Sequence, residues 1–209
     1  MSYDKQNQIT DCCYCGIRPS ETRDHIPPKC FFNKPRANDL ITVPACRLCN
    51  NSFSEDDELF KGYLGMHVAR FGGIAEAFFK NAAASTLRRK RRYTNEIVSK
   101  AERVVLNSRE FLKIKWDSDL HDRVIERIAR GLFYYHYSAR VPDSYRVKAQ
   151  WFNKEPDWEI HEEIQIFSIA NGEFKYGVLK VEESADSIWL FEFYKSHWAS
   201  AIIADNIED

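Results

Sequence analysis

Two pairs of cysteines carry the clearest chemical signal in the sequence. Cys12 and Cys15 form one CxxC pair in "CCYC", and Cys46 and Cys49 form a second in "CRLCNNSF", about thirty residues further on. Four thiolates at this spacing are the ligand set of a closed, tetrahedral structural zinc site. We therefore predict a structural Zn²⁺ held by these four side chains. Such a site has no open coordination position, so any catalysis must come from other residues.

The two remaining cysteines are weaker candidates. Cys13 could replace Cys12 as a ligand only with the less favourable CxC spacing, and Cys30 is expected to be a small buried apolar residue. The chain of 209 residues carries a formal net charge of −1, which indicates no global attraction to nucleic acid. It shows neither a secretory signal pattern nor a long apolar run, so we expect a cytoplasmic protein without a membrane partner. Thiols stay reduced in the cytoplasm, which favours metal binding over disulfides.

An acid beside a base lies between the two cysteine pairs, in "TRDHIPPKCFF". Neighbouring side chains of an extended strand point to opposite faces, so Asp24 could ligate a hard cation while His25 reaches a water molecule. A neutral imidazole accepts a proton at physiological pH. The dipeptide alone is common, and a purely structural histidine is the ordinary alternative.

The whole arrangement is more specific: CxxC, then Asp-His-Ile-Pro, then Asn-Asp-Leu-Ile, then CxxC-Asn. It resembles the HNH endonuclease family, the zinc-knuckle branch of the ββα-metal nucleases, over about residues 12–58. The resemblance implies that Asp24 and Asn50 ligate a catalytic divalent cation and that His25 is the general base. Oxygen ligands would favour Mg²⁺ or Mn²⁺ over zinc. Asn51 competes with Asn50 as ligand, with a helix cap as its alternative role.

The sequence departs from the family pattern at its middle position. The asparagine that orients the catalytic histidine in the family corresponds to Asp39, with Asn38 one residue earlier. We therefore carry Asp39 as a candidate site residue. The register near the second cysteine pair is shifted by an insertion at Pro44 and Ala45.

Local basic residues are the candidate contacts to nucleic acid. Lys29 follows the Asp-His motif and could reach a phosphate as a point charge; a solvated loop lysine is the alternative. The concentrated basic stretch "LRRKRRY" is a candidate for contacts to a phosphate backbone, with a solvated face as the alternative. Its candidate residues are Arg88, Arg89, Lys90, Arg91 and Arg92.

The resemblance implies a zinc-stapled, treble-clef-like ββα-metal module at residues 1–58. The remaining pattern predicts helices and a small antiparallel sheet at residues 59–209, so the expected fold class is α+β. Helices are expected at residues 54–71, capped by Ser54, at residues 74–92 and at residues 119–139. Strands are expected at residues 93–118, on both sides of Asn171-Gly172, and in "SIWLFEFY". The C-terminal part could shape a substrate groove, form a homodimer or dock a partner.

Two of the expected helices have a clear apolar face. They are Leu59, Phe60, Tyr63, Leu64 and Val68 in the first helix, and Val124, Ile125, Ile128, Leu132 and Tyr135 in the third. The histidines at positions 67, 121, 136, 161 and 197 match no catalytic pattern and receive no role.

Three functions are consistent with these sequence features. The first is a metal-dependent endonuclease that hydrolyses phosphodiester bonds, with DNA favoured as substrate. The second is a non-catalytic zinc module that binds nucleic acid or protein. The third is a nuclease subunit that is active only with a partner, as in phage-defence systems. The second needs only the cysteines and has no use for Asp24, His25 and Asn50 together.

Overall fold

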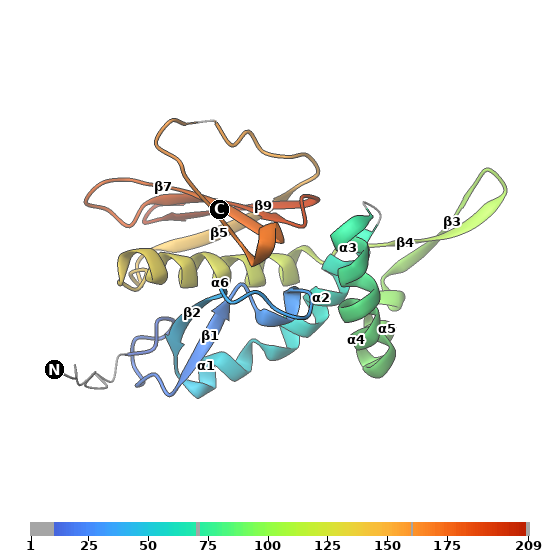
Figure 1. Cartoon of the computed structure of the whole chain (residues 1–209), viewed down its shortest axis with the longest axis horizontal. Coiled ribbons are helices and arrows are strands. Elements are labelled where there is room, and N and C mark those ends of the chain that lie inside the picture. Colours follow the sequence, from blue (N-terminus) through green and yellow to red (C-terminus); the bar gives the residue numbers. More distant parts are fainter. Residues whose placement is uncertain (1–10, 70–71, 160, 208–209) are drawn as a thin grey trace.

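The long helix α6 (Ser118–Tyr137) lies at the centre of the protein (Figure 1). In the computed structural model, which describes residues 11–69, 72–159 and 161–207, a five-stranded antiparallel sheet covers one side of α6. The N-terminal hairpin and helix α2 (Ser54–Val68) cover the other side. The expected class, a mixture of helices and antiparallel sheets, is confirmed.

The N-terminal part forms a hairpin followed by helices. Strand β1 (Thr22–Ile26) pairs antiparallel with β2 (Ile41–Ala45), and their connection contains the short 3-10 helix η1 (Lys29–Phe31). Helix α1 (Arg47–Ser52) and then α2 follow directly. The expected apolar face of α2 is buried, but its N-cap residue is Phe53 and Ser54 is the first helical residue. Residues 70 and 71, the end of that expected helix, lie outside the described residues.

The region after α2 is helical for longer than expected. It contains α3 (Gly73–Phe78), the π-helical turn η3 (Phe79–Ala83), α4 (Ala84–Arg89) and α5 (Arg91–Ser99). The expectation of strands from residue 93 is wrong as far as Ser99. Tyr93 and Ile97 are four residues apart and both are buried, so the spacing of one helical face decides the conformation there.

The next strands form a separate hairpin. Strands β3 (Ala101–Leu106) and β4 (Arg109–Ile114) pair with each other and project away from the rest of the molecule (Figure 1). Val105, Leu106 and Phe111 are exposed on this hairpin.

Helix α6 is amphipathic, as expected, with one exception. Val124, Ile125, Ile128 and Leu132 are buried, but Tyr135 is 50% exposed, so its assignment to the core face is wrong. The side chain of Asp117 caps the helix by accepting a hydrogen bond from the backbone N–H of Leu120, and Ser138 ends it in a left-handed conformation. The neighbouring residues Tyr134 and Tyr137 still pack against the core, so only Tyr135 of this last aromatic turn faces solvent.

The C-terminal sheet has the strand order β5-β9-β8-β7-β6. Its strands are β5 (Arg146–Phe152), β6 (Gln165–Ile169), β7 (Phe174–Lys180), β8 (Ser187–Phe193) and β9 (His197–Ala204). The hairpin expected around Asn171-Gly172 is confirmed, with the 3-10 turn η4 (Ala170–Gly172) between β6 and β7. Asn171 and Gly172 both have positive φ, the conformation that these two residues favour.

The turn between β6 and β7 is tied to the loop between β1 and β2. Glu173 accepts hydrogen bonds from the backbone and side-chain amides of Asn33, at 3.0 and 2.9 Å. Asp39 accepts one from the backbone N–H of Ala170, at 3.1 Å. Two segments about 130 residues apart in sequence are thus held side by side.

One hydrophobic core runs through both expected parts of the chain. Ile26 and Phe31 belong to the same buried cluster as Phe60 of α2 and Phe193 of β8. The expected boundary after residue 58 falls inside α2, and residues 1–10 of the expected module lie outside the described residues. Among the described helices, none is long and apolar enough to cross a membrane.

Candidate metal centre and candidate active site

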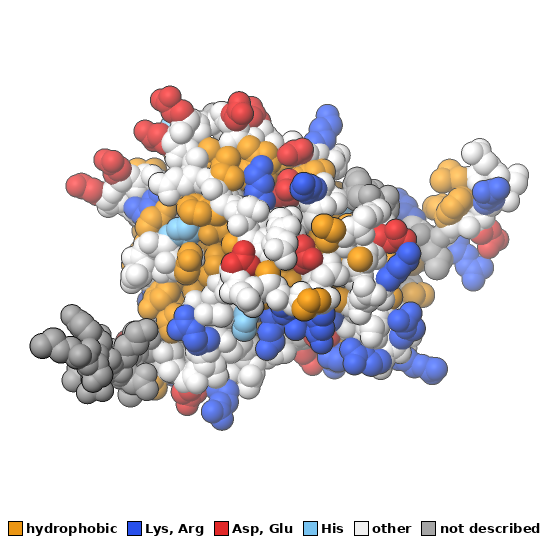
Figure 2. Space-filling model, in the orientation of Figure 1, with side chains coloured by type: hydrophobic (Ala, Val, Ile, Leu, Met, Phe, Trp, Pro, Cys, Tyr) orange, Lys and Arg blue, Asp and Glu red, His pale blue; other side chains and the backbone are white. Residues whose placement is uncertain are grey.

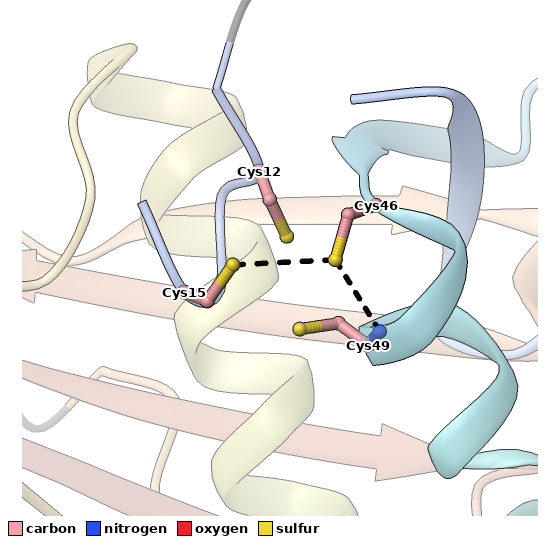
Figure 3. Close-up of side chains that lie close together, drawn as sticks. All are labelled: Cys12, Cys15, Cys46 and Cys49. Atoms are coloured by element: carbon pink, nitrogen blue, oxygen red, sulfur yellow. Dashed lines mark hydrogen bonds between the residues drawn. The ribbon is translucent and has the colours of Figure 1, made fainter. Parts of the chain in front are cut away.

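The four predicted cysteine ligands converge on one point (Figure 3). The sulfurs of Cys12, Cys15, Cys46 and Cys49 all lie within 4.8 Å of one another, and those of Cys15 and Cys46 are 4.0 Å apart. Tetrahedral coordination at a zinc–sulfur distance of about 2.3 Å requires sulfurs roughly 3.8 Å apart. The donor set therefore fits a structural metal such as zinc. Cys13 is buried in the main core, away from this cluster.

Local structure explains why these cysteines meet. Cys46 is the N-cap of α1, and its sulfur accepts a hydrogen bond from the backbone N–H of Cys49 at 3.4 Å. The first pair reaches the same place because the backbone N–H of Cys13 donates to the carbonyl of Pro44 at the end of β2. Backbone N–H groups aimed at sulfur favour the thiolate form that binds metal.

Strand β1 places the two candidate catalytic residues in different surroundings. Asp24 is only 7% exposed, whereas His25 is half-buried and lies opposite Thr42 in the register of the hairpin. The predicted separation of the two side chains by the strand is consistent with this difference. One side chain is held inside the protein and the other is accessible from solvent.

The carboxylate of Asp24 sits in a buried polar network. Tyr14, which lies between Cys13 and Cys15, donates a hydrogen bond from its hydroxyl to Oδ2 of Asp24 at 2.7 Å. Beneath it, Arg127 of α6 makes a bidentate ion pair with Asp57 of α2. Arg127 also lies over the ring of Phe53, 4.4 Å from its centroid. Tyr14, which directly precedes Cys15 in the sequence, therefore orients the carboxylate of Asp24.

His25 is surrounded by positive charge. Burial lowers its pKa below the ordinary 6.5, the charge of Lys29 lowers it further, and the charge of Asp24 opposes both. Arg36 and Arg23 add smaller effects in the same direction as Lys29. Arg23 reaches across to β2, where it donates hydrogen bonds to the hydroxyl and carbonyl oxygens of Thr42 at 2.8 and 2.9 Å. His25 is thus a neutral imidazole on a basic surface.

Of the two candidate asparagines, the structure brings Asn50 to strand β1. Its amide nitrogen donates to Oγ1 of Thr22 at 3.0 Å and to the carbonyl of Arg23 at 3.5 Å. Thr22 precedes Asp24 by two residues, so its side chain lies on the same face of the strand. Asn51 is exposed within α1 and is not a cap.

The oxygen donors Asp24 and Asn50 match Mg²⁺ or Mn²⁺ in kind. Mg²⁺ commonly keeps several water ligands and needs only one or two protein carboxylates. Oδ2 of Asp24 is engaged by Tyr14, and among the described residues the four cysteines are the sole group of three or more His, Cys, Asp or Glu side chains with ligand atoms close enough to share a metal ion. A cation bound here would therefore rest on few protein ligands.

Asp39 lies apart from these residues in its contacts. Its carboxylate is directed to the backbone of Ala170 and so fastens the loop before β2 to the C-terminal sheet. Any influence of Asp39 on His25 would pass through the position of that loop.

The basic stretch is exposed at the junction of α4 and α5. Arg88, Arg89, Lys90, Arg91 and Arg92 are all exposed, although Arg92 pairs with Glu55 at 2.8 Å and Lys90 with Glu58 at 3.8 Å. Figure 2 shows Lys and Arg side chains gathered at the lower right of this face, over α2, α4 and α5 of Figure 1. Lys29 is exposed in the loop after β1.

Sequence reasoning missed a cluster of histidines. His67 of α2, His121 of α6 and His197 of β9 meet beside Trp116, with ring centroids 5.1 Å apart for His67 and His197 and 5.3 Å for His121 and His197. His197 is fully buried, and neither of its ring nitrogens has a hydrogen-bond partner. These residues are far apart in sequence and share no motif, so no local signal could have joined them.

Comparison of the chain with protein-family models, with curated proteins and with solved structures gave no match. Only the residues of this chain therefore indicate its function.

Proposed function

We propose that this protein is a metal-dependent endonuclease of the HNH type, with DNA as the favoured substrate. In this proposal β1, β2 and α1 form the ββα-metal module, stapled by Zn²⁺ on the four cysteines. The observation that supports the proposal is the contact between α1 and β1: Asn50 donates hydrogen bonds to Thr22 and Arg23, the two residues that precede Asp24 and His25 in β1.

The proposed chemistry is hydrolysis of a phosphodiester bond. His25, half-buried and surrounded by cations, accepts the proton of the attacking water. Asp24 and Asn50 would hold Mg²⁺ or Mn²⁺, which when bound would stabilise negative charge on the phosphate and on the leaving oxygen. Tyr14 orients Asp24, and the exposed Lys29 attracts the phosphate group.

A nuclease assay on supercoiled plasmid tests this proposal, with single-stranded DNA and RNA as further substrates. The cation is varied by adding or omitting Mg²⁺ or Mn²⁺ without a chelator, so that the cysteine site keeps its metal. Wild type should nick DNA only with the cation. His25→Ala should lower the rate by about 10²- to 10⁴-fold, the usual contribution of a general base. His161→Ala, at an exposed histidine, is the matched control.

A second candidate is a zinc-stapled module that binds without catalysis. It is favoured by the structural engagement of two candidate site residues, since Asp24 accepts from Tyr14 and Asp39 from Ala170. Wild type that binds nucleic acid but fails to cleave with either cation would support this function. Cleavage that appears only on addition of a second protein would support the partner-dependent subunit, which we would then seek in the cytoplasm.

A further inference from the structure

A polar pocket lies between the loop after β1 and the helices α2 and α4. Its volume is about 360 Å³. Lys34 and Arg36 line it from the loop, Glu58 and Lys61 from α2, and Arg89 from α4. Four cations therefore face one carboxylate in a concave site, which marks the pocket as a place for an anion.

Lys61 is the unusual member of this set because it is buried. It is only 6% exposed, and its ammonium lies 3.8 Å from Oε2 of Glu58. This separation is an ion pair but is too long for a direct hydrogen bond. A buried ammonium has three N–H donors and is costly unless acceptors surround it. An oxyanion in the pocket would supply them.

Glu58 does not neutralise the pocket. Its carboxylate is shared between Lys61 and Lys90, each at 3.8 Å, while Lys34 and Arg89 stand exposed at the rim. Arg89 belongs to the basic stretch singled out in the sequence, so that stretch contributes directly to the pocket.

Arg36 links the pocket to the candidate active site. Its Nε donates to the backbone carbonyl of Lys29 at 2.7 Å, four residues after His25, and its charge acts on His25. A strand whose phosphate lies beside His25 would thus find a second set of cations a short distance along the loop. The volume is at the lower end of those of small-ligand sites, large enough for a nucleotide unit.

We propose that this pocket binds a phosphate group of the nucleic-acid strand, with Lys61 and Arg36 as its main contacts and Lys34 and Arg89 at its rim. The substrate class follows from the nuclease proposal, on which this inference rests. The phosphate is either an internal one of the backbone or one at the end of a strand, and the two sources share the same chemistry.

Binding is tested on the full chain without added divalent cation, so that no strand is cleaved. The probe is a short labelled single-stranded DNA, with or without a terminal phosphate at its unlabelled end, titrated at several salt concentrations. Lys61→Met keeps the apolar stem and removes the charge, and Lys34→Ala removes a cation from the exposed rim. Lys113→Met is the control, because Lys113 is exposed on the projecting hairpin, paired with Glu102.

Lys61→Met should weaken binding about tenfold or more, the usual effect of losing a charge-assisted hydrogen bond. The slope of log affinity against log salt concentration should become shallower, by about the amount expected for the loss of one phosphate contact. Lys34→Ala should act in the same direction more weakly, and it carries the test if circular dichroism shows that Lys61→Met is unfolded. Lys113→Met should bind like wild type.

The terminal phosphate separates the two sources. If its removal weakens wild type and leaves Lys61→Met unaffected, the pocket holds the strand end; if it changes neither, an internal phosphate is bound. Wild-type affinity and salt slope in folded Lys61→Met and Lys34→Ala would overturn the proposal. Binding that depends on Lys61 without any cleavage would refute only the nuclease, and cleavage lost in His25→Ala with binding independent of Lys61 would refute only the pocket.

Discussion

Tyr14 and Asp24 are joined by a hydrogen bond of 2.7 Å that connects the first cysteine pair to the strand of the candidate active site. The donor lies between Cys13 and Cys15, and the acceptor is the proposed cation ligand. The segment that carries Cys12 and Cys15 therefore also positions Asp24, which is not a ligand of the structural metal.

Removal of this hydrogen bond should alter the cation requirement. Tyr14→Phe leaves the ring packed at 5.0 Å from Phe53 and removes the hydroxyl that holds Asp24. Groups that orient a metal ligand typically contribute 10- to 100-fold to metal affinity or activity. We expect the Mg²⁺ concentration for half-maximal nicking to rise by about this factor. Tyr135→Phe, at an exposed tyrosine, should leave it unchanged; equal cation dependence in both variants would contradict the role of Tyr14 in orienting Asp24.

Loss of one cysteine ligand should release the structural metal. Binding of structural zinc contributes on the order of 10 kcal/mol to small metal-stapled modules, so Cys46→Ser should lower the melting temperature and abolish stoichiometric zinc. Elemental analysis of the purified protein and thermal unfolding measure both effects. Cys30→Ser, which changes a half-buried thiol outside the cluster, should keep its zinc. Full zinc content in Cys46→Ser would show that the cluster is not the binding site.

The sequence predicted this site better than its surroundings, for a physical reason. Two CxxC pairs and an Asn-Gly turn are local patterns that each permit few conformations, and both formed as expected. Residues 93–118 are expected to be strands with polar turns, and Tyr, Thr, Ile and Val do favour strands. Packing of Tyr93 and Ile97 against the core outweighed that preference.

Tertiary contacts between distant residues were beyond prediction. The acceptor for Tyr14, the partner of Asp39 and the burial of Lys61 all depend on contacts between different segments of the chain. No spacing along the chain encodes these contacts. The pocket in particular combines a loop with helices that sequence reasoning had treated as separate regions.

The close approach of α6 to β1 should be sensitive to one methyl group. A Cβ atom at Gly131 would lie 2.6 Å from Cγ1 and 2.7 Å from Cδ1 of Ile26, the neighbour of His25. Overpacking of this kind costs about 1–3 kcal/mol, which exceeds the gain of up to about 1 kcal/mol in helix propensity. Gly131→Ala should therefore lower the free energy of unfolding measured in urea.

Ile26→Ala provides the matched test, since it removes both crowded atoms. The double variant should be more stable than the sum of the two single effects, because the new methyl group then enters the space left by Ile26. If the losses in the free energy of unfolding of the two single variants were additive, the new methyl group at Gly131 would not be crowded by Ile26.

Protonation of the buried His197 should destabilise the protein in acid. Burial lowers the pKa of His197 well below 6.5, and the charges of His121 and His67 lower it further. Below pH 6.5 the unfolded chain therefore takes up a proton at this position that the folded chain does not. The free energy of unfolding should fall as the pH falls below 6.5, by up to about 1.4 kcal/mol per pH unit for one proton.

His197→Phe should make this pH dependence shallower. The new ring would pack among aromatic neighbours such as Trp116 and Phe193, whose centroids lie 5.3 and 6.0 Å from that of His197. Urea unfolding between pH 7 and pH 4.5 measures the slope, with His161→Gln at an exposed position as control. An unchanged slope in His197→Phe would assign the acid sensitivity to other groups.

The ties from Asn33 and Asp39 to the turn at residues 170–173 limit how far the N-terminal segment can be separated from the rest. Small nuclease modules are often thought of as cassettes that can be cut out and fused to new targeting domains. In this chain the loop that follows His25 takes its shape from a hairpin near the other terminus, and both share one core. A fragment ending after α2 would keep its cysteines but lose the hairpin that shapes this loop, so we do not expect the N-terminal segment to be portable by itself.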